Sequence, residues 1–135
     1  MDIKITLAGK SCTVRTLRDT GNTLRNPVDG SSVLVIEADA LASIWKPPTE
    51  AILSAAIPPE EKLTQLYAQG HTNFSLVPYQ SIGEDQGLLL AVRSDYIQIG
   101  RRICPKALLA LSPYPIGNGI YHGLWGGMEY ATHSL

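Results

Sequence analysis

A helical block interrupts a chain whose apolar residues otherwise follow the pattern of β-strands, and this interruption is the feature that most constrains the fold. Before the block, residues 2–7 place Ile3, Ile5 and Leu7 on one face, which indicates a half-buried strand. Further stretches of apolar and β-branched residues predict strands at 12–18, 33–36, 73–79, 87–93, 95–100 and 103–111. The pattern predicts one mainly β domain over residues 1–135.

The helical block covers residues 39–70 and divides into three short segments. The first, 39–45, lacks alternation, and the second follows Thr49 in a capping position. The third, residues 60–69, begins after a Pro-Pro pair and closes at Gly70, where a helix C-cap is expected. We therefore expect a small helical insertion within a β domain.

Composition excludes several classes of protein. The 135 residues carry a formal net charge of -1, so there is no basic surplus to displace counterions from nucleic-acid phosphates. No apolar run approaches the roughly 20 residues that a membrane-spanning helix needs. With 44% hydrophobic residues, intrinsic disorder is not expected. A folded globular domain remains, with no nucleic-acid partner.

The cysteines and histidines do not predict a metal or cofactor site. Cys12 and Cys104 form no CxxC pair, and the three histidines share no metal-ligand spacing. Both cysteines lie in or beside predicted strands, where a small buried hydrophobe is the ordinary interpretation. We therefore expect neither a metal nor a cofactor.

The segment that best suits chemistry is the turn after the second strand, Asp19-Thr20-Gly21-Asn22. The strand would fix the direction of the Asp19 carboxylate, and Gly21 would let a backbone N–H approach it. The Thr20 hydroxyl could donate a hydrogen bond that braces the loop. Taken alone, the tripeptide Asp-Thr-Gly is more often an ordinary turn.

The longer pattern resembles a known family. Residues 19–27 read Asp-Thr-Gly-Asn-x-Leu-x-x-Pro, and the matching segments continue in order at 33–37, 77–83, 87–89 and 94–99, ending near Tyr121. This set resembles the sporulation sigma-E factor processing peptidases, the stage II GA proteins of spore-forming Firmicutes. The resemblance implies an aspartic protease domain, a single-lobe barrel of the pepsin and retropepsin type with a helical insertion around 39–70. Asp19 would be catalytic, Thr20 and Gly21 would brace its loop, and Asn22 would fix the exit of the loop.

Two further segments look like parts of that fold. Residues 79–83, with Tyr79, Ser81 and Gly83, are similar to the flap hairpin that covers the cleft of pepsin-like enzymes. An ordinary surface hairpin is the alternative interpretation. Leu124-Trp125-Gly126 resembles the hydrophobic-hydrophobic-glycine element beneath the catalytic loop, and a glycine-rich turn is its alternative.

Arg18 departs from the family pattern, which usually has an apolar residue before the catalytic aspartate. On a strand it points away from the Asp19 side. A buried unpaired guanidinium would be costly. We therefore expect Arg18 to find a partner such as Glu37 or Glu129, to reach solvent at an interface, or to mark an impaired copy.

Aspartic proteases need two carboxylates that share a proton, yet Asp19 alone of the six aspartates is followed by Thr/Ser-Gly. The others are Asp2, Asp29, Asp39, Asp85 and Asp95. The second carboxylate is therefore expected from Asp19 of another copy, across a two-fold axis.

By resemblance, the reaction is removal of the N-terminal pro-segment of a sporulation sigma factor precursor, pro-sigma-E. The family also implies a forespore-derived activator protein, a mother-cell cytoplasmic location, and membrane attachment through an N-terminal domain that these residues do not include. The chain is expected to be an excised peptidase domain or a shortened relative.

Two other interpretations remain open. A non-catalytic domain of the same fold could act in protein interaction, which Arg18 would favour. A cysteine hydrolase using Cys12 or Cys104 with His122 is the other, although neither cysteine has a setting that would lower its pKa.

Overall fold

One sheet contains all the strands in the part of the chain that the structure describes. The computed structural model describes residues 1–18, 24–80 and 86–126. The strands are β1 (Asp2–Leu7), β2 (Lys10–Arg18), β3 (Leu34–Glu37), β4 (Phe74–Gln80), β5 (Gln86–Arg93), β6 (Tyr96–Ile99), β7 (Arg102–Pro105), β8 (Leu108–Ser112) and β9 (Gly123–Trp125). The helices are η1 (Ala38–Leu41), η2 (Glu50–Leu53) and α1 (Pro59–Ala68). The helices fall between β3 and β4, so the expected helical insertion is confirmed.

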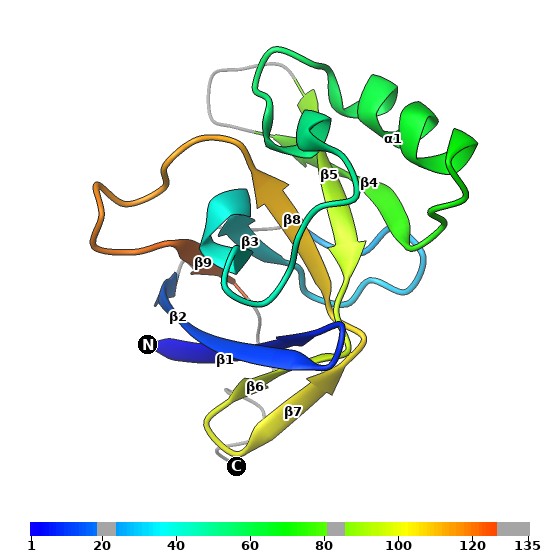
Figure 1. Ribbon diagram of the computed structural model, residues 1–135. Coiled ribbons are helices and arrows are strands. Elements are labelled where there is room, and N and C mark those ends of the chain that lie inside the picture. The colour runs from blue at the N-terminus through cyan, green and yellow to red at the C-terminus, as the bar shows by residue number, and fades with distance from the viewer. Residues whose placement is uncertain (19–23, 81–85, 127–135) are drawn as a thin grey trace.

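The strand order in the sheet is β4-β5-β8-β3-β9-β2-β1-β6-β7. Most neighbours are antiparallel, while β9 runs parallel to β2 and β8 runs parallel to β3. The sheet curls, with α1 against β4 and β5 on one side and the β6–β7 hairpin at the opposite end (Figure 1). The predicted fold class, a mainly β single-lobe barrel, is confirmed.

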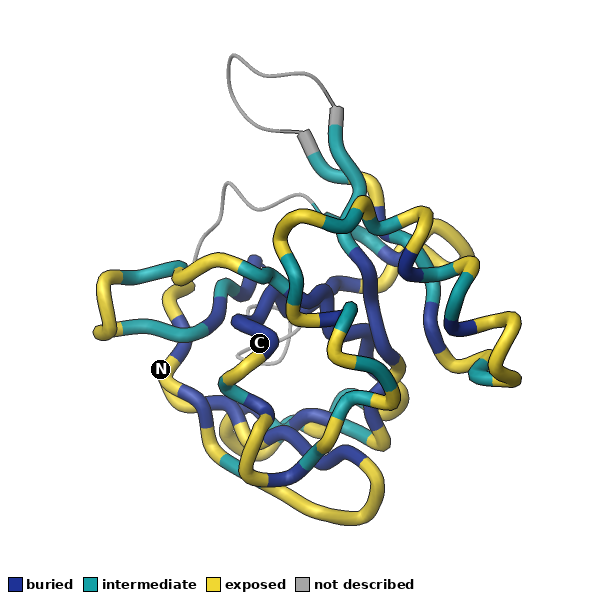
Figure 2. The backbone as a smooth tube through the Cα atoms, turned by 45° about the horizontal axis from the view of Figure 1, so that its top comes forward, coloured by how far each residue is buried: buried dark blue, intermediate teal, exposed yellow. Residues whose placement is uncertain are grey.

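The curl encloses one main core. Ile3 and Ile97, from one end of the sheet, belong to the same buried cluster as Leu109 and Val92, from the other end. Buried segments lie toward the middle of the molecule, and many of the turns at its edge are exposed (Figure 2). Because apolar burial is the dominant favourable term in folding, this shared core holds the curled sheet together.

A second, smaller cluster lies apart from the main core. Its buried members are Val33, Val35, Val77, Ala91, Leu108 and Ala110, with Leu24, Leu89, Ile116 and Leu124 packed against them. Val35 alternates with Leu34 and Ile36 of the main core. Since neighbouring side chains of a strand point to opposite faces, both faces of β3 are buried.

The first hairpin turns one residue earlier than its glycine suggests. Ala8 and Gly9 are the two turn residues, with φ of +53° and +79°, and Leu7 pairs with Lys10. Two consecutive residues with positive φ form the kind of turn whose twist matches that of the flanking strands. Lys10 follows the turn directly and is the first residue of β2, although a Gly9-Lys10 turn is the one that the sequence favours.

The helical insertion is less helical than expected at its start. η1 and η2 are single 3-10 turns of four residues each, shorter than the segments predicted at 39–45 and after Thr49. The third segment, α1, forms as predicted and ends at Ala68, and Gly70 just beyond its C-cap has a φ of +86°. Among the described residues, none of the helices combines the length and apolar character that a membrane crossing needs.

The expectation of a single strand over 103–111 is wrong. The segment divides into β7 and β8, because Lys106 adopts a left-handed conformation with φ of +54° and its N–H donates to the Asp95 carbonyl. Pro105, which has no N–H for a ladder, stands at the break. Ser94 stabilises the bend by donating its hydroxyl to the Ala107 carbonyl at 2.7 Å.

We predict that Trp125→Ala lowers the free energy of unfolding by about 3–5 kcal/mol, because Trp125 is 1% exposed and belongs to the main core. Chemical denaturation followed by circular dichroism measures the change. Ile103→Ala is the control, since Ile103 is 56% exposed and should change stability by less than about 0.5 kcal/mol. Equal losses in the two variants would contradict the prediction.

Candidate functional site

The predicted catalytic loop lies outside the described residues. Asp19, Thr20, Gly21 and Asn22 fall between the end of β2 at Arg18 and the next described residue, Leu24. The predicted flap-tip residues Ser81 and Gly83 also lie outside the described residues. The structure therefore locates the strands that lead into these segments and the surfaces beside them.

The chain approaches Asp19 along the junction of β2 with β9. Leu17 is the register partner of Leu124, and Arg18 is that of Trp125. Neighbouring strands lie about 5 Å apart, so the end of β2 runs directly beside the Leu124-Trp125 element. Trp125 is buried in the main core, and Leu124 packs against the second cluster.

Arg18 is exposed, whereas the carboxylate of Glu37, one partner considered for it, binds His122 and the Ile116 N–H. Because Arg18 is exposed, its guanidinium avoids the desolvation that a buried position would impose. Glu129, the other partner considered, lies outside the described residues.

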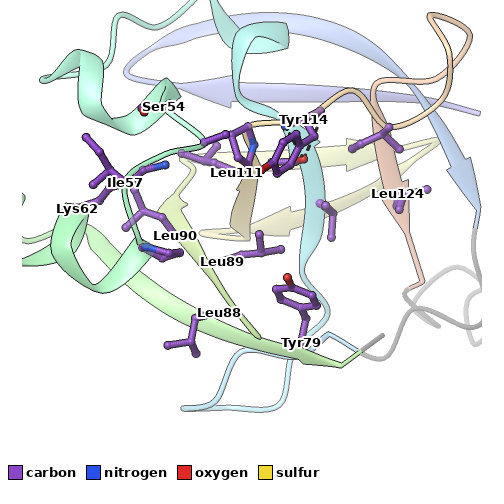
Figure 3. A pocket seen from close by; sticks show the side chains of 16 residues that line it. Ser54, Ile57, Lys62, Tyr79, Leu88, Leu89, Leu90, Leu111, Tyr114 and Leu124 are labelled. Atoms are coloured by element: carbon purple, nitrogen blue, oxygen red, sulfur yellow. Dashed lines mark hydrogen bonds between the residues drawn. The ribbon is translucent and has the colours of Figure 1, made fainter. Parts of the chain in front are cut away.

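A pocket of about 440 Å³ lies between the β4–β5 hairpin, β9, the segment after β8 and the helical insertion (Figure 3). This volume is in the range of ligand-binding clefts. Its lining is mainly apolar. The lining residues are Val35, Ser54, Ala55, Ile57, Pro59, Lys62, Tyr79, Leu88, Leu89, Leu90, Leu111, Ser112, Pro113, Tyr114, Ile116 and Leu124.

Two residues predicted for the site, Tyr79 and Leu124, both line this pocket. Figure 3 shows the Tyr79 hydroxyl directed from β4 into the pocket, with Leu124 on β9 at its other side. Leu124 is also the register partner of Leu17, two residues before Asp19. Gly126, which is buried, follows β9 and does not line the pocket. The pocket is thus lined in part by β9, the strand that pairs with the end of β2 before the predicted catalytic loop.

A glycine on the neighbouring strand allows the position of the Tyr79 ring. Gly87 pairs with Tyr79 across the hairpin, and a Cβ built on Gly87 would lie 2.5 Å from Cζ of that ring. Real Cβ atoms do not approach a carbon so closely, so any side chain at position 87 would push the ring away. Sequence reasoning missed this role, although the Tyr/Gly pairing across a hairpin could have indicated it.

We predict that Gly87→Ala and Tyr79→Ala are strongly coupled. Gly87→Ala should lower the free energy of unfolding by about 1–3 kcal/mol with Tyr79 in place, because the added methyl overpacks against the ring. In the Tyr79→Ala background the same change should have little effect. A double-mutant cycle by chemical denaturation measures the coupling. Additive losses would contradict the packing described here.

A buried carboxylate fixes the wall of the pocket that follows β8. Glu37, at the end of β3, accepts a 2.8 Å hydrogen bond from the Ile116 N–H and lies 3.0 Å from Nδ1 of His122. Burial raises the pKa of Glu37, but these hydrogen bonds and the charge of His122 outweigh it, so the pKa lies below its usual value. Ile116 lines the pocket, so Glu37 positions part of its wall.

The lowered pKa of Glu37 predicts a pH dependence of stability. Its stabilising contribution is fully present above the unfolded-state pKa, near 4.5, and is lost as pH falls through the lower folded-state pKa. Glu37→Gln should lower the free energy of unfolding by about 1.5–3 kcal/mol at pH 7.

Denaturation curves between pH 7 and pH 3 test this, and the difference from the unaltered chain should shrink toward the acid end. Glu50→Gln, at an exposed glutamate, serves as the control. A difference that is constant with pH would mean that the Glu37 charge does not contribute.

The cysteines gain no support as nucleophiles. Burial raises the pKa of the Cys12 thiol more than its hydrogen bond with Ser43 lowers it, which disfavours the thiolate. The Nδ1 atom of His122 is hydrogen-bonded to the Glu37 carboxylate and not to a cysteine. In the described ranges, no group of three His, Cys, Asp or Glu side chains could hold a metal ion.

Comparisons with known proteins place the chain in a family of sporulation factors. Residues 1–119 match the family model described as Sporulation factor SpoIIGA, and the chain belongs to that family. It is similar to the sporulation sigma-E factor-processing peptidase of Priestia megaterium (strain ATCC 12872 / QMB1551), with 27% identity over 99 residues. That similarity covers 73% of this chain and 32% of the relative, so the chain spans about a third of the relative's length. No solved structure matches significantly. The resemblance noted in the sequence is confirmed.

Proposed function

We propose that the chain is an aspartic endopeptidase domain whose active site forms when two copies bring their Asp19 carboxylates together. The observation that carries this proposal is the position of the apolar pocket. It is bounded by the β4–β5 hairpin and by Leu124, the register partner of Leu17, two residues before Asp19. A pocket beside the approach to an Asp-Thr-Gly loop is where a peptide substrate would bind.

The other aspartates have local roles, which supports a second copy as the source of the second carboxylate. Asp95 accepts the Gly9 N–H at 2.9 Å, and Asp29 accepts the Ser31 N–H at 2.9 Å. Asp2 lies 3.9 Å from Arg15 in an exposed pair, and Asp39 lies in the first turn of η1. Asp85 lies outside the described residues. None of the four described aspartates is among the residues that line the pocket.

In the proposed reaction, the two Asp19 carboxylates share one proton, because two like charges in close contact cannot both remain ionised. The ionised carboxylate removes a proton from water as its oxygen attacks the peptide carbonyl carbon. The protonated one donates to the carbonyl oxygen. Collapse of the tetrahedral gem-diol intermediate breaks the C–N bond. The departing nitrogen takes a proton from one carboxyl group, and one hydroxyl of the intermediate returns its proton to the other carboxylate, which restores the singly protonated dyad.

The supporting residues keep the roles that the resemblance gives them. Thr20 and Gly21 would brace the catalytic loop, and Asn22 would fix its exit. Tyr79, Ser81 and Gly83 would belong to a flap that excludes water and binds the extended substrate.

The substrate we propose is a sigma factor precursor that loses its N-terminal pro-segment. The name of the Priestia megaterium relative, a sporulation sigma-E factor-processing peptidase, supports this assignment. A forespore-derived activator, action on the mother-cell side and membrane attachment through a further N-terminal domain belong to the same proposal.

We predict that Asp19→Asn lowers the rate of precursor cleavage at least about 100-fold, because the amide cannot share or transfer the catalytic proton. Incubating the chain with the precursor and measuring the product's size tests this. Activity per chain should rise with protein concentration, because the site needs two copies. Asp29→Asn, at an exposed turn, is the control and should retain activity.

Full activity of Asp19→Asn would show that Asp19 is not catalytic. Activity per chain that does not depend on protein concentration would contradict the requirement for a second copy. Precursor that binds equally to both proteins without being cut would identify the chain as a non-catalytic interaction domain.

A further inference from the structure

The pocket contains one buried cation. Among its described lining residues, Lys62 alone carries a formal charge at neutral pH. Lys62 lies on α1, at the wall that the helical insertion contributes together with Ser54 and Ile57 (Figure 3). Its side chain belongs to a residue that is only 4% exposed, so solvent does little to screen its charge.

The ammonium of Lys62 is only partly satisfied by the protein. Nζ donates a 3.1 Å hydrogen bond to the Ile52 carbonyl in η2. In the described part of the chain it has no other hydrogen bond and no ion pair. Glu60 and Glu61, its neighbours on α1, are exposed. Since an ammonium has three N–H donors, two remain for a ligand.

A buried charge without a counter-ion is unfavourable, and burial lowers the pKa of Lys62. A ligand carboxylate beside Nζ would supply the missing counter-charge and accept the remaining donors. Charge-assisted hydrogen bonds of this kind are about twice as strong as neutral ones. The apolar lining, including Leu90 and Ile57, suits a hydrocarbon stem that leads to such a carboxylate.

We propose that Lys62 determines specificity by binding an acidic side chain of the peptide substrate, whose stem lies in the apolar pocket and whose carboxylate pairs with Nζ. This inference rests on the proposed endopeptidase function. A single cation matches a single carboxylate, which favours an acidic residue over a doubly charged phosphate. Lys62 contributes through binding and takes no part in the proton transfers assigned to Asp19.

A set of capped octapeptides tests the proposal, with two central leucines, alanine elsewhere, and Glu, Gln or Met placed in turn at each position. Binding is measured by fluorescence anisotropy on chains that carry Asp19→Asn, and cleavage on chains that retain Asp19. We expect Glu to be preferred over Gln at least about tenfold at one position.

Lys62→Met should abolish that preference, and Lys62→Arg, which keeps the charge, should restore much of it. Lys46→Met is the matched control, because Lys46 is an exposed lysine of the same insertion and does not line the pocket. Circular dichroism checks that each variant folds. Lys62→Met should not destabilise the chain greatly, since an apolar side chain of similar length replaces a buried charge.

The absence of a Glu preference at every position, or a preference that survives in Lys62→Met, would overturn the proposal. A Lys62-dependent preference in binding without any cleavage would instead overturn the endopeptidase function and leave the pocket assignment standing. Cleavage at equal rates for the Glu, Gln and Met peptides would overturn the role of Lys62 and leave the endopeptidase function standing.

Discussion

The position of β9 is the constraint on which the rest of the structure depends. This strand of three residues lies between β2 and β3 and joins β2-β1-β6-β7 to β4-β5-β8-β3. His122, the residue before it, extends the connection, because its N–H donates to Arg15 and its carbonyl accepts from Glu37. Both halves of the sheet are aligned through this short segment, which also contributes Leu124 to the lining of the pocket.

Local patterns predicted most of the elements but not the pairings between distant ones. The alternation of β1 and the Pro-Pro and Gly70 boundaries of α1 identified elements that the structure contains. β9 was noted only as a glycine-flanked apolar element, since a strand of three residues has too little periodicity to be recognised. Its pairing with β2 and β3 depends on contacts some 90 to 110 residues apart in the chain.

A motif or a resemblance indicated site residues, and their roles stay predictions. Tyr79 and Leu124 both line the pocket, while Asp19 lies outside the described residues. The roles of Glu37 and Lys62 were missed, because each depends on a tertiary neighbour. A partial signal for Lys62 existed, since it stands four residues before buried Leu66 and so on the same face of α1.

The packing of α1 on the hairpin has a consequence for substrate entry. α1 contacts both β4 and β5, and the hydroxyl of Tyr67 donates to the Phe74 carbonyl at the start of β4. Lys62 on α1 and Tyr79 on β4 therefore lie on two elements that pack directly against each other. The spacing between the cation and the phenol, and hence the shape of peptide that the pocket can accept, is set by this one helix–strand contact.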